Sequence, residues 1–196
     1  MLNTIVPGVA PALLYTGTSE VAKVGYSVGF GYGGDGVTGF DSSAYPYGTK
    51  RAMQNQIDLI LDTSFSVNLS GTILLSDFDS PDESKNSLYP FSNATPLPLE
   101  GMGAPGDSGG AVFVQDGSQW YLAGVHSFLA DIGSPLGDGI PNAKYGDLLG
   151  SMRVSSYVNW INQHIGTPSA IPEPGTMTLV ALGLLPVVGR LRGRSN

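Results

Sequence analysis

The stretch Gly106–Gly110, with the sequence Gly-Asp-Ser-Gly-Gly, is the part of this chain from which its fold is most readily inferred. The apolar run Ala111–Phe113 follows it directly. Glycine lacks a Cβ and adopts conformations that other residues avoid, so Gly106 and Gly109 allow a sharp turn. Successive backbone N–H groups of such a turn can stabilise a negatively charged oxygen. The pattern therefore predicts a nucleophile, Ser108, on a tight turn leading into a strand; a glycine-rich hairpin loop is the alternative.

The composition favours one all-β domain followed by a tail. The 196 residues are 41% hydrophobic and 13% charged, with 28 glycines and 14 prolines. Frequent turn-forming residues between short apolar segments are typical of antiparallel β structure. The length suits a single domain. The chain contains no cysteine, which excludes disulfides and cysteine-based metal sites.

The net charge argues against nucleic-acid binding, and the spacing of the histidines and acidic residues argues against metal binding. Residues 1–170 hold 15 acidic and 6 basic side chains, a net charge of −9 without a basic patch. The histidines, His126 and His164, are far apart and lack the spacing of zinc ligands, so we expect no metal and no other cofactor. Asp77, Asp79, Asp82 and Glu83 lie in an acidic segment whose spacing misses that of a calcium-binding loop. A solvated surface loop is the preferred interpretation of this segment.

Hydrophobic periodicity locates the secondary structure. Apolar residues at every second position between Val21 and Tyr32 predict a strand with one apolar face. Helical spacing of apolar residues over 154–165 predicts a helix, capped by Ser155 or Ser156. The other predicted strands span 56–61, 65–75, 111–114 and 120–127, and the predicted loops span 33–52, 76–99 and 130–142.

Three of these stretches resemble the C-terminal part of trypsin-like (chymotrypsin-fold) serine proteases. Residues 106–110 resemble the nucleophile motif, Gly29–Gly31 the Gly-Trp-Gly that opens the second barrel, and residues 153–161 the terminal helix. The resemblance covers roughly residues 5–165 and implies the second six-stranded antiparallel β-barrel of that double-barrel fold, with a C-terminal helix and a short hydrophobic tail helix. The implied divisions are an inter-barrel segment (1–20), the barrel with its helix (21–165), a linker (166–170) and a tail (171–196).

The same resemblance implies roles for the residues of the turn. Ser108 would be the nucleophile that forms an acyl-enzyme, and the backbone N–H groups of Gly106 and Ser108 would form the oxyanion hole. Asp107 would support the oxyanion turn, because in the family the residue at its position pairs with a newly freed N-terminus. The expected partner is a peptide or protein substrate.

The resemblance also implies a substrate-binding set, Met102, His126, Ser127 and Phe128. Met102 stands at the pocket base, where trypsin has an aspartate, so basic specificity is disfavoured. A histidine at the position of His126 resembles the acidic-residue-specific branch, in which an imidazole receives a Glu side chain; a plain wall histidine is the alternative. Leu129 replaces the family's glycine and would narrow the pocket mouth.

The family's catalytic histidine and aspartate are not matched. They belong to the first barrel, and no Ala-Ala-His sequence occurs here. We therefore expect an N-terminally truncated form of a serine-type endopeptidase, with the base encoded upstream, and expect this chain alone to be nearly inactive. The alternative is an inactive protease homologue that serves as a surface binding protein or an extracellular-matrix protein.

The tail resembles the PEP-CTERM sorting signal of Gram-negative bacteria. An apolar run over 177–188 is shorter than the roughly 18–20 residues that span a membrane. The resemblance implies export, transient membrane contact, cleavage by an exosortase-type enzyme, and a final location in the cell envelope or outside the cell. The residues that carry it are Pro172, Glu173, Pro174, Arg190, Arg192 and Arg194.

Overall fold

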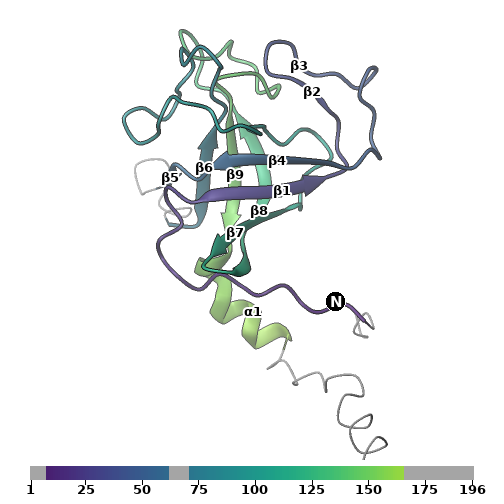
Figure 1. The fold of residues 1–196 in the computed structure, drawn as a ribbon, viewed down its shortest axis with the longest axis vertical. Helices are drawn as coiled ribbons and strands as arrows, with labels where there is room; N and C mark the ends of the chain where they lie inside the picture. The colour runs from purple at the N-terminus through teal and green to yellow at the C-terminus, as the bar shows by residue number, and fades with distance from the viewer. Residues whose placement is uncertain (1–7, 62–70, 166–196) are drawn as a thin grey trace, which may run out of the picture. The chain divides into compact units, whose positions relative to one another are not determined.

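The structure is a computed structural model that describes residues 8–61 and 71–165. The chain divides into two compact units, Met1–Asn159 and Trp160–Asn196. Its elements can be followed along the colour ramp of Figure 1. They are β1 (Val24–Gly29), β2 (Gly34–Asp35), β3 (Gly39–Phe40), β4 (Arg51–Gln56), β5 (Leu59–Ile60), β6 (Ile73–Asp77), β7 (Ala111–Asp116), β8 (Gln119–Ala130), β9 (Leu148–Arg153), the 3-10 helix η1 (Val154–Tyr157) and α1 (Val158–Ile165).

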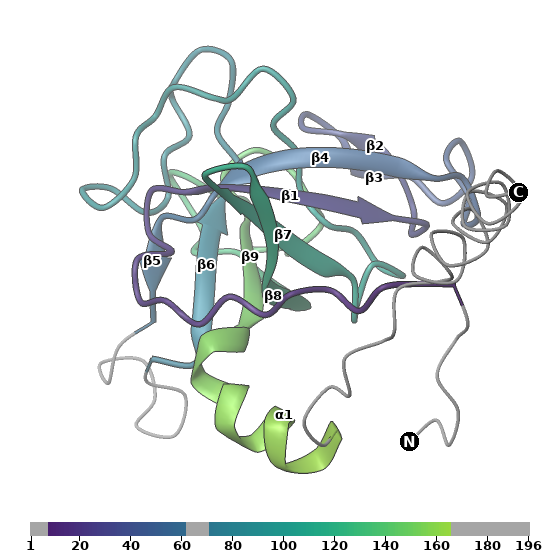
Figure 2. The same ribbon diagram turned by 60° about the horizontal axis from the view of Figure 1, so that its bottom comes forward.

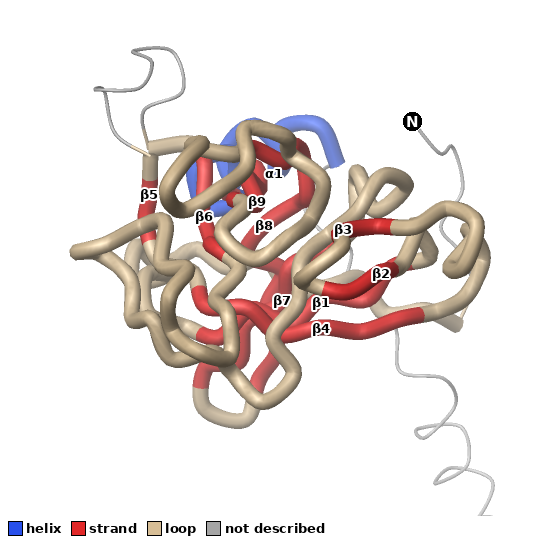
Figure 3. Tube along the Cα trace, turned by 90° about the horizontal axis from the view of Figure 1, so that it is seen from above, coloured by secondary structure: helices blue, strands red, loops and turns tan. Residues whose placement is uncertain are grey.

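Seven of the strands in the described residues form one antiparallel sheet in the order β4-β1-β7-β8-β9-β6-β5. The sheet curls into a half-barrel, and Figures 1 and 2 show β1 and β4 running across the direction of β6 and β9. The hairpin of β2 and β3 is separate from this sheet (Figure 3). The prediction of an all-β fold is confirmed.

The two edge strands of the sheet, β4 and β5, are consecutive pieces of chain separated only by Ile57 and Asp58. The Ile57 N–H donates to the Lys23 carbonyl at 3.0 Å, and the Asp58 N–H donates to the Leu75 carbonyl at 2.9 Å. The chain therefore leaves the side of β1 and joins β6 within two residues. The sheet has seven strands, whereas the resemblance implies six.

Apolar side chains in two clusters stabilise the curled sheet, since burying apolar surface is the main driving force of folding. The segment before β1 contributes Tyr15, whose N–H donates to the Leu122 carbonyl of β8 at 2.9 Å. The first cluster contains Tyr15, Ile57, Leu74, Val112, Val114 and Ala123, and the second contains Leu61, Ile73, Leu75, Leu88 and Leu148.

Strand β1 forms where its alternating pattern predicted, but its apolar residues do not face the core. Val28 is 47% exposed, whereas Gly25 and Ser27 are buried. A Cβ at Gly25 would stand 2.9 Å from the Val112 side chain, and the Ser27 hydroxyl is hydrogen-bonded to His126. Tertiary contacts, rather than side-chain hydropathy, therefore decide which face of β1 points inward.

The side-chain cap predicted for the terminal helix is absent. The predicted helix is present, with a 3-10 first turn, but it has no side-chain cap. The Ser155 hydroxyl donates instead to Glu20 Oε1 at 2.6 Å, and the Ser156 hydroxyl donates to the Gly71 carbonyl at 2.6 Å. Strand β9, just before the helix, was not predicted, although its first four residues are all buried.

The acidic segment after β6 is not the solvated loop that the sequence suggested. Asp77 and Asp79 are 1% and 6% exposed, while Asp82 and Glu83 are exposed as expected. In the part of the chain described, no three acidic, histidine or cysteine side chains gather so that they could hold a metal ion.

The predicted linker and sorting tail, 166–196, lie outside the described residues. Over 8–61 and 71–165, the structure contains no helix with the length and apolarity needed to cross a membrane.

Candidate active site

The Ser108 turn lies between the end of one loop and the start of β7. Gly106 and Gly109 have φ of +99° and +84°, in the region that only glycine adopts freely, and Ser108 is exposed. The Asp107 N–H donates to the Ala104 carbonyl at 3.0 Å. The turn conformation predicted from the glycines is therefore present.

The turn leaves two backbone donors unused. The N–H groups of Gly109 and Gly110 donate to the carbonyls of His126 and Asp107, each at 2.9 Å. By contrast, the N–H groups of Gly106 and Ser108 meet no acceptor among residues 8–61 and 71–165. Free N–H groups beside a hydroxyl are what an oxyanion hole requires. These two donors are the pair predicted for that role.

Asp107 fixes the turn through both of its carboxylate oxygens. Oδ1 accepts the Gly31 N–H at 2.8 Å, and Oδ2 accepts the Ala104 N–H at 3.0 Å. A Cβ at Gly31 would lie 2.7 Å from the Asp107 carboxyl carbon, and one at Gly29 would overlap the same carboxylate. The glycines of Gly29–Gly31 thus leave room for the Asp107 side chain. Its predicted pairing with a newly freed N-terminus stays a prediction, because no such terminus is among the described residues.

His126 is a buried residue of β8 whose two ring nitrogens are both engaged. Nε2 lies 2.9 Å from the Ser27 hydroxyl of β1, and Nδ1 lies 3.1 Å from the Ser151 hydroxyl of β9. Burial lowers the pKa of His126, and the negative charge of Asp107 opposes this shift only in part. The imidazole is therefore neutral at pH 7. Within the described chain it makes no hydrogen bond to Ser108, so it is not placed as the base for that hydroxyl.

A cavity of about 260 Å³ has Ser108 among its lining residues. His126, Ser127 and Phe128 also line it, so the structure brings three of the four predicted substrate-binding residues to the nucleophile. Sequence reasoning missed Leu149, which lines the same cavity from the unpredicted strand β9.

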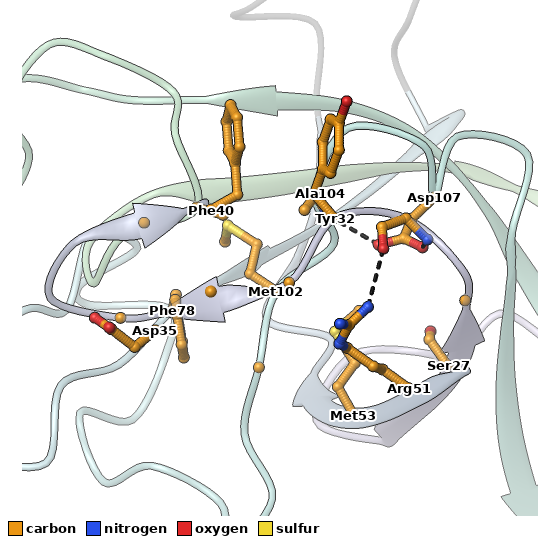
Figure 4. Close-up of a pocket in the computed structure, with 18 of the residues that line it drawn as sticks. Ser27, Tyr32, Asp35, Phe40, Arg51, Met53, Phe78, Met102, Ala104 and Asp107 are labelled. Atoms are coloured by element: carbon orange, nitrogen blue, oxygen red, sulfur yellow. Dashed lines mark hydrogen bonds between the residues drawn. The ribbon is translucent and has the colours of Figure 1, made fainter. Parts of the chain in front are cut away.

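Met102, the fourth predicted residue, lines a neighbouring cavity of about 360 Å³ and not the one beside Ser108. Figure 4 shows this larger cavity, with Asp107 and Arg51 near one end and Asp35 and Phe78 near the other. The Arg51 guanidinium donates to the Gly31 carbonyl at 3.2 Å, which reinforces the segment that holds Asp107.

One edge of β8 beside the turn is unpaired. The pairing of β8 with β7 ends at Val125, and the His126 N–H donates to the Gly110 carbonyl at 2.8 Å. From Phe128 to Ala130, β8 pairs with β9 on one side, after a bulge at Ser127, and with no backbone of the described residues on the other. An open strand edge can accept an extended peptide by adding a strand.

The second histidine is engaged within its own helix. His164 Nδ1 lies 2.7 Å from the Trp160 carbonyl, and its ring stacks on the Trp160 ring with centroids 4.3 Å apart.

Comparison with known proteins adds no identification, because no protein-family description matches the chain and no curated protein matches it either.

Proposed function

We propose that this chain is part of a serine-type endopeptidase with a trypsin-like fold, in which Ser108 forms an ester with the acyl group of a peptide substrate. The observation that carries the proposal is the pair of N–H groups at Gly106 and Ser108, which have no acceptor among the described residues and lie beside the exposed Ser108 hydroxyl. The other donors of the turn are all occupied, so the turn is held in place while these two stay available.

The fold supports this proposal in two ways. If β4 and β5 are counted as one bent strand, the curled sheet has the six strands of the barrel that the resemblance implies. The space that the Asp107 side chain occupies also explains why glycines stand at positions 29 and 31. The Asp107 carboxylate thereby joins the Gly29–Gly31 segment to the Gly106–Gly110 turn that carries the nucleophile.

The geometry supports the following chemistry. An extended peptide lies along the free edge of β8 at Ser127–Ala130, with its scissile carbonyl at Ser108. The Ser108 oxygen attacks the carbonyl carbon, its proton passes to a base, and the oxyanion accepts hydrogen bonds from the N–H groups of Gly106 and Ser108. The amine leaves with that proton, and water then hydrolyses the ester.

The base must come from outside the described residues. His126 is neutral, buried and bonded to Ser27 and Ser151, so it cannot accept the Ser108 proton without breaking those contacts. We therefore expect slow acylation by the chain alone, with the oxyanion hole supplying a residual acceleration of about 10³-fold over water. Export and sorting through 171–196 remain part of this proposal.

The test is covalent labelling with an activated peptide ester in imidazole buffer, which supplies an external base. Peptide mapping by mass spectrometry should find the acyl group on Ser108. Ser108→Ala should remove it, whereas Ser118→Ala, at an exposed serine in the β7–β8 turn, should keep it. Equal labelling of the parent chain and of Ser108→Ala would overturn the proposal.

A second function, peptide binding without cleavage, is favoured by the engagement of His126. An inactive homologue would keep the open edge of β8 and the cavity but form no ester. In the labelling experiment, peptide binding without any acyl group on Ser108 would support this function instead.

A further inference from the structure

The side chains that line the cavity beside Ser108 do not form the Glu-binding site that was one interpretation of the sequence. The identity of a substrate side chain is decided by the groups that contact it. A histidine in this strand suggested either a site for Glu or a plain wall residue. The structure allows each group in the cavity wall to be assessed for that role.

The first group is His126, whose ring cannot serve a carboxylate as it stands. Both of its nitrogens are within 3.1 Å of hydroxyls, those of Ser27 and Ser151, and the side chain is 7% exposed. The ring therefore joins β8 to β1 and β9, and no ring nitrogen is left to receive a ligand. Over residues 8–61 and 71–165, no lysine or arginine lines the cavity.

The second group is Asp107, the only acidic side chain that the described residues contribute to the lining. Each of its oxygens already accepts a backbone N–H, one from Gly31 and one from Ala104. Its negative charge disfavours an acidic substrate side chain nearby. A basic side chain would have to compete with the two hydrogen bonds that hold the turn.

The remaining wall is largely apolar. Leu129 and Leu149 are directly opposite one another in the pairing of β8 with β9, and both line the cavity. Ala104, Pro105 and Phe128 complete the apolar lining. A charged side chain entering here would lose hydration without gaining a partner, which is strongly unfavourable.

From these contacts we propose that the cavity beside Ser108 accepts an uncharged, apolar side chain of the peptide residue on the acyl side of the cleaved bond, with Leu129 and Leu149 as its specificity-determining residues. This inference rests on the proposed function for the direction in which the peptide lies. It assigns His126 the structural role of a bridge between strands.

The test measures binding, so that it does not depend on ester formation. Peptides of the form acetyl-Ala-Ala-Pro-X with a free C-terminal carboxylate, where X is Leu, Glu or Lys, are titrated into the full chain at pH 7. Binding is followed by amide NMR shifts of residues in the Ser108 turn. We expect the Leu peptide to bind at least about tenfold more tightly than the other two, as is usual for an apolar pocket.

Two variants sharpen the result. Leu129→Arg places a cation at the cavity and should reverse the order, so that the Glu peptide binds about tenfold more tightly than the Leu peptide. Leu99→Ala removes an exposed leucine that does not line the cavity and should leave the order unchanged. Circular dichroism checks that each variant is folded.

The outcomes separate this inference from the proposed function. Tightest binding of the Glu or the Lys peptide to the parent chain, or no binding of any peptide, overturns the inference. Labelling of Ser108 together with a Glu preference leaves the proposed function in place and removes only the inference. A Leu preference without labelling of Ser108 supports the inference and favours the non-cleaving function.

Discussion

Two buried carboxylate regions of this protein show opposite electrostatic behaviour. Glu20, which is fully buried, bonds to the Arg153 guanidinium through both oxygens at 2.8 and 2.9 Å. Burial alone would raise its pKa, but the hydrogen bonds from Arg153 and Ser155 outweigh burial and leave the pKa of Glu20 below its ordinary value. Glu20 is therefore a charged, satisfied group that ties the segment before β1 to the end of β9.

The second region lies around Asp58 and Asp77, whose hydrogen-bond partners among the described residues include no cation. Asp58 Oδ2 accepts the Asp77 N–H at 3.3 Å, and Asp77 Oδ1 and Asp79 Oδ1 have no hydrogen-bond partner in the described structure. Burial, reinforced by the charge of Asp77, raises the pKa of Asp58 to about 8. Burial, with the charges of Asp77 and Glu100, raises the pKa of Asp79 to about 7. Burial of a carboxylate thus has opposite consequences in the two regions, and the presence of a cation makes the difference.

Breaking the first region should give the largest effect. Arg153→Met leaves Glu20 buried without its cation and should lower the free energy of unfolding by about 3–5 kcal/mol. Urea denaturation at pH 7 measures the change. The double variant Glu20→Gln/Arg153→Met removes both charges and should recover much of the loss; if it is as unstable as Arg153→Met, packing by the arginine matters more than its charge.

The second region should make stability depend on pH. Asp58 and Asp79 keep their protons in the folded state at pH values where the unfolded chain has lost them, because their folded pKa values are raised. Their stabilising contribution is present in full below about pH 4 and is lost as the pH rises through about 7 for Asp79 and about 8 for Asp58.

Urea denaturation between pH 5 and pH 8 should therefore show falling stability in this window. Asp58→Asn keeps an oxygen for the Asp77 N–H but cannot ionise. Its free energy of unfolding should therefore fall less steeply with pH, and it should be more stable than the parent protein at pH 8. If the free energy of unfolding of Asp58→Asn falls with pH as steeply as that of the parent protein, Asp58 does not cause the pH dependence.

An exposed ion pair should give the smallest effect. Lys23 Nζ and Asp116 Oδ1 lie 3.7 Å apart, and the Asp116 side chain is 59% exposed. Solvent screens such a pair, so Asp116→Asn should change the free energy of unfolding by less than about 0.5 kcal/mol at pH 7. A loss comparable with that of Arg153→Met would contradict the view that burial determines how much an ion pair contributes to the free energy of unfolding.

Much of the candidate site could be predicted from local sequence. The Gly106–Gly110 turn and the hairpin of β7 and β8 follow from glycine conformation and from alternation, both properties of neighbouring residues. The part of the cavity supplied by β9 could not be predicted, because Leu149 lies far along the chain and its strand carries no alternating pattern. The sequence left open whether His126 receives a substrate carboxylate or is a plain wall residue, and its partners Ser27 and Ser151 could not be predicted, since they are distant in sequence and meet it only in the folded sheet.

The sequence by itself determined the all-β class, the sharp turn at Ser108 and the terminal helix, because each depends on conformational preferences over a few residues. Tertiary structure decided which face of β1 is buried, which carboxylates are charged, and which side chains surround Ser108. These properties depend on pairing across the sheet and on desolvation, which arise only when residues distant in sequence come together.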